Sequence, residues 1–323
     1  MSIEPIEDFL RRAGWADANR RPLLSDASAR RYHRLQRGAE TAILMVAPVD
    51  TAEGRDSFAA FLRVGAYLRG QGICAPEVYA KDALLGLMLL EDFGDLRVSG
   101  LLGSDAGRDA YETAIDLACD LGASPVPPWV KQPSVTDQIG MVDLTFDQLP
   151  GQMDLADSLR SGLRKALETY TPGPLVLSLR DYHGDNLIWR PTQIGLARLG
   201  VLDFQDAVAL PMGYDIASLI DDPRRVLPDA LRVHLVARAA ERAKIALPDM
   251  QARIDTLSLL RNLRILGIFH RLSQNGKPSY RAFLPRTMDL VRQVAANPGL
   301  AEMRQDVEAT LRAVAPWTAG GNR

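Results

Sequence analysis

Hydrophobic residues in the first ninety positions switch between the spacing of strands and the spacing of helices. Apolar and polar residues alternate around a turn at residues 37–40, which predicts a hairpin. Apolar residues three and four apart then predict a helix that ends at Gly70-Gln71-Gly72. The predicted elements are a helix over residues 6–12, strands over 31–36 and 41–46, a helix over 56–69, and strands over 77–80 and 87–90.

Helical spacing dominates the chain after residues 91–95. A proline-rich break at 125–128 interrupts it, and a polar segment at 175–207 is flanked by strand-like apolar runs. From residue 214 to residue 314 nearly all of the pattern is helical. The predicted helices cover residues 105–121, 135–148, 153–170, 228–245 and 250–272.

This order of elements predicts an α+β protein of two lobes. A small mixed α/β lobe over residues 1–92 is followed by a larger, mostly helical lobe over residues 93–323, with a hinge at about residues 91–95. A cleft between two such lobes is a common place for a ligand. We therefore expect the small lobe to bind a nucleotide and the large lobe to carry catalysis and substrate binding.

Composition narrows the class of protein. The chain has 323 residues, 47% of them hydrophobic, and a formal net charge of −2, so no basic excess suggests a nucleic-acid partner. The two cysteines form no metal-binding or disulfide pattern, which favours a reducing compartment. The acidic N-terminus lacks the apolar core of a signal peptide, and no apolar run is long enough to span a bilayer. We expect a cytoplasmic protein without a membrane partner or an obligate protein partner.

The polar segment carries the densest chemistry. Asp181 and Asn186 lie in a loop after a strand-like run, and a second such run ends at Asp203. A D-x-x-x-x-N motif followed by a hydrophobic-Asp-Phe strand end is what a kinase-type phosphoryl-transfer site requires. Asp181 is then the group that accepts the proton of the attacking hydroxyl, and Asn186 and Asp203 are oxygen ligands for a Mg²⁺ ion that bridges the phosphates of ATP.

With these motifs the chain resembles a known family. Residues 87–94, Leu-Met-Leu-Leu-Glu-Asp-Phe-Gly, and residues 211–217 resemble the hinge strand and the post-metal segment of the aminoglycoside phosphotransferase/choline kinase group, which has the protein-kinase-like fold. Residues 25–32, 202–207 and 261–269 are similar to bacterial anomeric sugar kinases. Those enzymes phosphorylate N-acetylmuramate and N-acetylglucosamine during cell-wall recycling. The resemblance implies ATP, Mg²⁺ and a small-molecule hydroxyl substrate.

The nucleotide site departs from the family pattern. Met45 stands where kinases place an ATP-binding lysine, Leu179 replaces the usual histidine, and the glycine-rich loop is missing. Either Arg30 or Arg31 binds phosphate instead, or the metal and the backbone hold the nucleotide. The small residues at 25–29 offer backbone N–H groups for this. The expected nucleotide-binding residues are Ser25, Ser28, Arg30, Arg31, Met45, Glu91 and Phe93.

A second register of the motif competes with the first. His183-Gly184-Asp185 would make Asp185 the base, but this register requires Asn at position 190, where Arg190 stands. We therefore favour Asp181 and expect Asp185 to cap the loop or face solvent. Asp215 is expected to support the loop.

Four further residues have two interpretations each. His183 contacts substrate or holds the loop, and Asp206 contacts sugar hydroxyls or caps a turn at 207–210. Arg261 and Asn262 line a substrate cleft or form the solvated face of a helix. The candidate substrate-binding residues are thus His183, Asp206, Arg261 and Asn262.

Two other functions stay open at this point. The acceptor is instead an aminoglycoside, choline, homoserine or another small alcohol, or the chain is a catalytically silent nucleotide-binding module. Met45 and Leu179 favour the silent module, and the intact set of Asp181, Asn186 and Asp203 argues against it.

Overall fold

The computed structural model describes residues 3–23 and 29–319. The chain forms two compact units, one made of Met1–Leu101 and Gly184–Ala207 and the other of Leu102–His183 and Val208–Arg323. A lobe boundary at residue 92 stays a proposal. Residues 93–101 and 184–207 lie in the first unit, because β-bridges join Arg97 to Ile188 and Cys74 to Gly200.

A five-stranded antiparallel sheet forms the body of the first unit, in the order β1-β2-β3-β5-β4. The predicted hairpin at residues 37–40 is present, and it pairs Arg37 with Glu40. Strand β1 (Asn19–Leu23), which precedes the hairpin, was not predicted, because its residues are mostly exposed and their burial does not alternate. The strands are β1 (Asn19–Leu23), β2 (Arg31–Arg37), β3 (Glu40–Val46), β4 (Val78–Asp82) and β5 (Leu87–Glu91).

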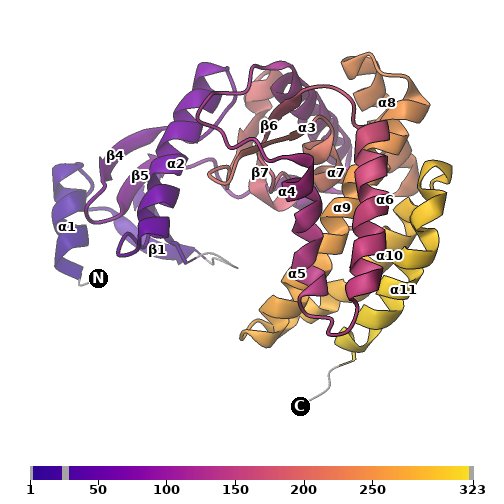
Figure 1. The fold of residues 1–323 in the computed structure, drawn as a ribbon. Coiled ribbons are helices and arrows are strands. Elements are labelled where there is room, and N and C mark those ends of the chain that lie inside the picture. The colour runs from indigo at the N-terminus through magenta and orange to yellow at the C-terminus, as the bar shows by residue number, and fades with distance from the viewer. Residues whose placement is uncertain (1–2, 24–28, 320–323) are drawn as a thin grey trace. The chain divides into compact units, whose positions relative to one another are not determined.

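One face of this sheet packs on helix α1 (Ile3–Arg12), as Figure 1 shows. Ala42, Leu44 and Val46 of β3 belong to this core, together with Trp15. Side chains alternate along a strand, so Met45 lies on the opposite face.

Helix α2 (Ala52–Gly70) follows the hairpin. The Thr51 side chain caps its first turn by accepting from Gly54 N at 3.1 Å, a contact that contributes about 1 kcal/mol in typical helices. The predicted end at Gly70 is confirmed, and Gly72 adopts a φ of +77° that favours glycine. Phe61 of α2 stacks on Phe204 with ring centroids 4.8 Å apart, which joins the helix to residues 184–207 within the same unit.

Helices dominate the second unit, and α9 is its central element (Figure 1). Most of its residues are buried, since it packs against α5, α6, α7, α8 and α10. A two-stranded sheet of β6 (Leu175–Ser178) and β9 (Val208–Pro211) lies in the same unit. The helices are α3 (Asp105–Ala123), α4 (Val135–Ile139), α5 (Asp143–Phe146), α6 (Met153–Tyr170), α7 (Tyr214–Ile220), α8 (Asp229–Ala243), α9 (Leu247–Gln274), α10 (Leu284–Ala295) and α11 (Arg304–Val314).

The single helix predicted over residues 135–148 is wrong. The chain forms α4, a 3₁₀ turn over Gly140–Val142 and then the short α5. The reason is a close backbone approach to α9, where a Cβ on Gly267 would lie 2.1 Å from the Leu144 carbonyl oxygen. Thr145 Oγ1 also donates to Leu263 O at 2.5 Å and accepts from Gly267 N at 2.8 Å.

Within the described part of the chain, no helix has the length and apolar character needed to cross a bilayer.

Candidate active site

Asp181 lies at the end of a short loop that follows β6 in the second unit. Asp181 is half-buried, and its backbone N–H donates to Leu179 O at 2.8 Å. The residue before it, Arg180, has a φ of +71°. A non-glycine residue in this region is strained, and such strain is concentrated at functional sites.

Asp215, in the first turn of α7, holds this loop in place. Its carboxylate accepts from Ser178 Oγ at 2.6 Å and from the backbone N–H groups of Leu179 at 2.8 Å and Arg180 at 3.0 Å. Burial raises the pKa of Asp215 to about 6 against the opposing effect of these hydrogen bonds. The expected supporting role of Asp215 is confirmed.

Asn186 and Asp203 lie together in the first unit. A hairpin of β7 (Leu187–Trp189) and β8 (Leu199–Val201) separates them in sequence, and Leu202 N donates to Asn186 O at 2.9 Å just beyond its open end. Asn186 Nδ2 lies 3.4 Å from Asp203 Oδ2, and Gln205 Nε2 donates to Asp203 Oδ1 at 2.8 Å.

This pair has the chemistry of a site for a hard divalent cation. An amide oxygen and a carboxylate are the donors that Mg²⁺ takes from proteins. Asp203 is exposed and has a φ of +58°, a strained conformation for a non-glycine residue that fixes the direction of its side chain. Asn186 and Asp203 are therefore placed so that both can contribute an oxygen to one ion.

Asp185 is held by contacts in the first unit. Its carboxylate accepts from Ser99 Oγ, and its backbone carbonyl accepts from Arg97 Nη1 at 2.5 Å. Arg190, at the position where the second register requires Asn, forms an ion pair with Glu91 at 3.0 Å. These contacts support the choice of Asp181 over Asp185 as the base.

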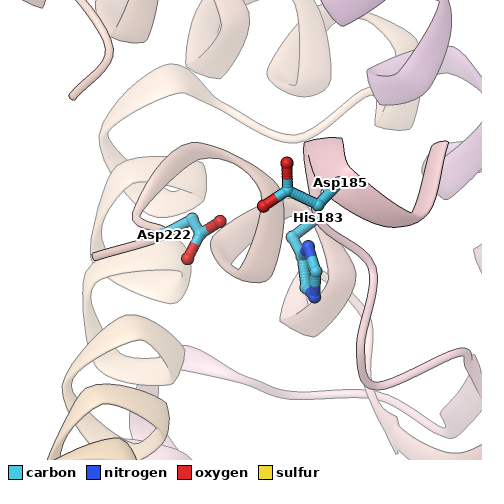
Figure 2. A group of neighbouring side chains, drawn as sticks. All are labelled: His183, Asp185 and Asp222. Atoms are coloured by element: carbon cyan, nitrogen blue, oxygen red, sulfur yellow. The ribbon is translucent and has the colours of Figure 1, made fainter. Parts of the chain in front are cut away.

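His183 is buried in the second unit. A ring nitrogen of His183 and a carboxylate oxygen of Asp222 lie within 4.8 Å of one another. Figure 2 draws both side chains with that of Asp185, which follows His183 by two residues. Asp222 already forms an ion pair with Arg224 at 3.0 Å. Both interpretations of His183, substrate contact and loop support, fit this position.

Of the residues expected to bind nucleotide, Met45 lies on the face of the sheet opposite to helix α1. Met45 is fully buried and pairs with Tyr32 on β2 and Met88 on β5. Burial raises the pKa of Tyr32, a hydrogen bond from Arg30 opposes this, and Asp203 is close enough to act on Tyr32 electrostatically. This face of the sheet therefore lies near the metal-ligand pair of the same unit.

Arg30 and Arg31 differ in their surroundings. Arg30 is 7% exposed, and its Nη2 donates to Ser57 Oγ on α2 at 2.6 Å, whereas Arg31 is exposed on β2. Only Arg30 thus has the kind of anchored position that a phosphate-binding cation needs. Ser25 and Ser28 lie outside the described residues.

Glu91 and Phe93 contact Arg190 in the structure. Glu91 forms the ion pair described above, and the Arg190 guanidinium lies 4.5 Å from the centroid of the Phe93 ring. The Phe93 ring also packs against Gly200. A Cβ atom added to Gly200 would lie only 2.4 Å from this ring, so the position requires glycine. These contacts order the segment at residues 91–93, and nucleotide binding by Glu91 and Phe93 stays a prediction.

Asp206 is exposed and lines a cavity of about 520 Å³ in the first unit, together with Gln205 and residues of α2 such as Ser57 and Arg63. Residues 207–210 do not form the turn that Asp206 was expected to cap, because Val208–Pro211 is strand β9. The sugar-binding interpretation of Asp206 stays a prediction.

Arg261 and Asn262 do not form a solvated face. Arg261 is 2% exposed and Asn262 is 0% exposed, because α9 is covered on nearly all sides. Asn262 Nδ2 donates to Ser258 Oγ at 3.1 Å and to Asp221 O at 3.3 Å. The solvated-face interpretation of these two residues is wrong, and their binding of substrate stays a prediction.

Sequence reasoning missed three residues that share this environment, Arg180, Tyr214 and Arg264. Tyr214 is buried at the start of α7, and Arg180, Asp181, Arg261 and Arg264 all act on it electrostatically. The spacing of Arg261 and Arg264, three residues apart on one helix, is the signal that predicts a shared face. Nothing in the sequence places Tyr214 or Arg180 beside it.

Comparison with known families decides the class of this site. Residues 19–253, most of the chain, match the phosphotransferase enzyme family. The chain belongs to this family. It is therefore a phosphotransferase, and membership implies the use of ATP with a divalent metal.

Two curated relatives cover this phosphotransferase almost end to end. The N-acetylmuramate/N-acetylglucosamine kinase of Caulobacter vibrioides is 33% identical, over 92% of this chain and 93% of the relative. The protein of the same name from Pseudomonas aeruginosa is 30% identical, over 90% of this chain and 89% of the relative.

Solved structures confirm the two-lobed kinase-like α+β fold. A choline/ethanolamine kinase family protein from Mesorhizobium loti matches with a TM-score of 0.65 and 17% identity, over 97% of this chain and 99% of that one. An aminoglycoside 2′-phosphotransferase-IIIa variant in complex with GDP matches with a TM-score of 0.65 and 14% identity, over 94% of this chain and 100% of that one. At these identities the likeness shows the fold alone.

Proposed function

We propose that this phosphotransferase uses ATP and Mg²⁺ to phosphorylate the anomeric hydroxyl of N-acetylmuramate and N-acetylglucosamine, a reaction of cell-wall recycling. The observation that carries the proposal is the complete set of Asp181, Asn186 and Asp203 in a chain that is 33% identical, over 92% of its length, to a kinase named for these sugars. The finer assignments below rest on this set.

Asp181 is the proposed general base. It accepts the proton of the anomeric hydroxyl while that oxygen forms a bond to the γ-phosphorus and the bond from phosphorus to the ADP oxygen breaks. Its half-buried position on a loop braced by Asp215 keeps the carboxylate in one orientation and still open to a substrate. No covalent enzyme intermediate is expected, since no activated nucleophile accompanies the site.

Asn186 and Asp203 are the proposed ligands of Mg²⁺. The ion supplies neutralisation of the triphosphate charge that would otherwise repel an oxygen nucleophile. The 3.4 Å approach of Asn186 Nδ2 to Asp203 Oδ2 supports this role, because the two side chains already share one small volume. Rotation of the Asn186 amide would then turn its oxygen toward the ion.

Arg30 is the proposed replacement for the missing lysine. Its hydrogen bond to Ser57 on α2 and its electrostatic influence on Tyr32, which Asp203 also influences, support a position beside the nucleotide phosphates. Met45, Glu91 and Phe93 are proposed to shape the nucleotide site through burial and hinge geometry.

The charge around Asp181 argues against a cationic acceptor such as an aminoglycoside or choline. Arg180 and Arg264 both lie in electrostatic range of the same tyrosine as Asp181. Positive groups of the enzyme repel a polycation, so a neutral or anionic sugar is the better fit.

A matched pair of variants tests the catalytic assignment. Consumption of ATP is measured with Mg²⁺ and N-acetylglucosamine, N-acetylmuramate, an aminoglycoside, choline or homoserine. The parent is expected to turn over only the amino sugars. D181N is expected to lower kcat by about 10²- to 10⁴-fold with ATP binding retained, because it removes a general base.

D185N is the control, since Asp185 bonds Ser99 and not the substrate in this account. A large loss of kcat in D185N with a small loss in D181N would reverse the register. ATP binding without turnover of any acceptor by the parent would instead identify a silent nucleotide-binding module.

A further inference from the structure

Three arginines are gathered beside Asp181 in the second unit. Arg261 and Arg264 lie one turn apart on α9, and Arg180 precedes Asp181 in the loop. Helix α7 connects these segments, because Asp215 accepts from Arg180 N at 3.0 Å and Asn262 Nδ2 donates to the carbonyl of Asp221 at the end of α7.

Tyr214, the first residue of α7, is the centre of this group. The hydroxyl is in electrostatic range of Arg264, Arg261, Asp181 and Arg180. Arg264 in turn is in range of Tyr214, Arg180, Asp181 and Arg261. The four charged side chains therefore all lie in electrostatic range of the Tyr214 hydroxyl, within a single unit. We name Arg180, Arg261, Arg264 and Tyr214 the basic cluster.

The cluster holds polar groups that the folded chain does not satisfy. Arg261 is 2% exposed and Tyr214 is 1% exposed, and neither Arg261 Nη1 nor the Tyr214 hydroxyl has a hydrogen-bond partner in the described residues. Among residues 3–23 and 29–319, none of the three guanidinium groups forms an ion pair with a carboxylate. Arg180 and Arg264 are only partly buried, so a ligand can reach the cluster from their side.

Buried charges in proteins are normally paired, because desolvation of a lone charge is costly. Arg232 of the same unit follows this rule, since it is paired with both Asp221 and Asp255 at 2.9 Å. The buried Arg253 instead donates to the backbone carbonyls of Met212 and Pro172. The basic cluster carries three positive charges, and Asp181 is the carboxylate in electrostatic range of Tyr214 and Arg264. The nearby Asp215 carboxylate already accepts from Ser178 Oγ and from the backbone N–H groups of Leu179 and Arg180. An anion is therefore the missing partner, and a planar guanidinium fork suits a carboxylate or a phosphate.

The two proposed sugar substrates differ by one anionic group. N-acetylmuramate is N-acetylglucosamine with a lactic acid ether on its 3-hydroxyl, and the lactyl carboxylate is its only charge. With the anomeric hydroxyl at Asp181, the basic cluster is the group of cations that shares its electrostatic surroundings with the sugar-binding carboxylate.

We propose that Arg264 and Arg261, with the Tyr214 hydroxyl, bind the lactyl carboxylate of N-acetylmuramate, so that the enzyme prefers this sugar to N-acetylglucosamine. This inference rests on the proposed function. The other source of an anion is the phosphoryl group in transfer, and binding of that group would affect both sugars alike. Comparison of the two sugars therefore separates the two sources.

The first test uses the unaltered enzyme and three acceptors: N-acetylmuramate, its neutral methyl ester and N-acetylglucosamine. We expect kcat/KM to be about 10- to 100-fold higher for N-acetylmuramate than for the ester, which is the range for hydrogen bonds to a charged group. The loss is expected mainly in KM. Equal kcat/KM for the acid and its ester would overturn the proposal.

The second test uses R264M and R261M, with R271M as the control on an exposed position of the same helix. The ratio of kcat/KM for N-acetylmuramate to that for N-acetylglucosamine is expected to fall by about 10- to 100-fold in R264M and to stay at the parent value in R271M. A parallel loss for both sugars would assign the arginines to phosphate and overturn the proposal.

A failure to fold and a failure of the proposed function can each be distinguished from a failure of this inference. If R261M fails to fold, as thermal unfolding would show, R264M and the ester comparison still decide the question. Failure of the parent to use either sugar would remove the proposed function and this inference together. Turnover of N-acetylglucosamine without any preference for the acid would remove this inference alone.

Discussion

Two strained residues mark the candidate chemistry at the scale of single residues. Arg180, Asp203 and Lys244 are the non-glycine residues with positive φ among those that the structure describes. Lys244 has an ordinary role, because it ends α8 in the left-handed conformation common at helix C-termini. Arg180 adjoins the proposed base, and Asp203 is a proposed metal ligand. Strain that recurs at these two positions supports their assignment.

The buried carboxyl group of Asp215 predicts how the free energy of unfolding depends on pH. Its folded pKa of about 6 exceeds the ordinary value of 3.8, so folding disfavours the charged form. Its contribution to stability is therefore fully present below about pH 4 and is lost as the pH rises through 6. The difference in unfolding free energy between the parent and D215N should fall by about 2 kcal/mol from pH 4 to pH 7, because one pKa unit corresponds to about 1.4 kcal/mol and part of the shift is already lost at pH 4.

Urea unfolding at several pH values measures this difference, and D215N, whose side chain at this position carries no charge at any pH, serves as the baseline. A difference that grows with pH would contradict the account. It would mean that the hydrogen bonds from Ser178, Leu179 and Arg180 outweigh burial and lower the pKa of Asp215.

At the scale of elements, helix α2 differs from the corresponding helix of kinases in which a glutamate forms an ion pair with the ATP-binding lysine. Its buried face holds Phe58, Phe61 and Val64, and the contact toward β2 is the hydroxyl of Ser57 with Arg30. A hydroxyl can orient a guanidinium without neutralising it. The Ser57 contact thus holds Arg30 in position beside α2.

This arrangement predicts a difference between two neighbouring arginines. R30M is expected to raise KM for ATP by about 10- to 100-fold, since it removes a charge-assisted contact to phosphate. R31M is the control, because Arg31 is exposed and is expected to change KM by less than about threefold. A larger effect from R31M than from R30M would show that the exposed arginine binds the phosphates.

The break between α4 and α5 shows why sequence patterns mislead at element boundaries. Residues 135–148 have helical spacing, but Gly267 on α9 brings its backbone against Leu144, and the chain there turns through a 3₁₀ segment. Gly267 is more than a hundred residues away in sequence. A local pattern contains no information about such an approach.

At the scale of the whole molecule, the sequence predicted what depends on local order and missed what depends on distant contacts. Most of the helices, the first hairpin and the fold class follow from spacing, whereas the roles of Asp181, Asn186 and Asp203 stay predictions from their motif. Membership of residues 184–207 in the first unit does not, because it depends on bridges to Cys74 and Arg97. The basic cluster is also invisible in the sequence, since α7 alone brings Tyr214 to the loop and to α9.

The proposed reaction of the whole enzyme is transfer of the γ-phosphoryl group of ATP to the anomeric oxygen of an N-acetylated amino sugar. The most direct measurement is ³¹P and ¹H NMR of the product made from ATP, Mg²⁺ and N-acetylmuramate. We predict one new phosphorus resonance that couples to the anomeric proton of the sugar and disappears on mild acid treatment. An acid-stable phosphate coupled to the protons at C6, or no sugar phosphate at all, would contradict the claim.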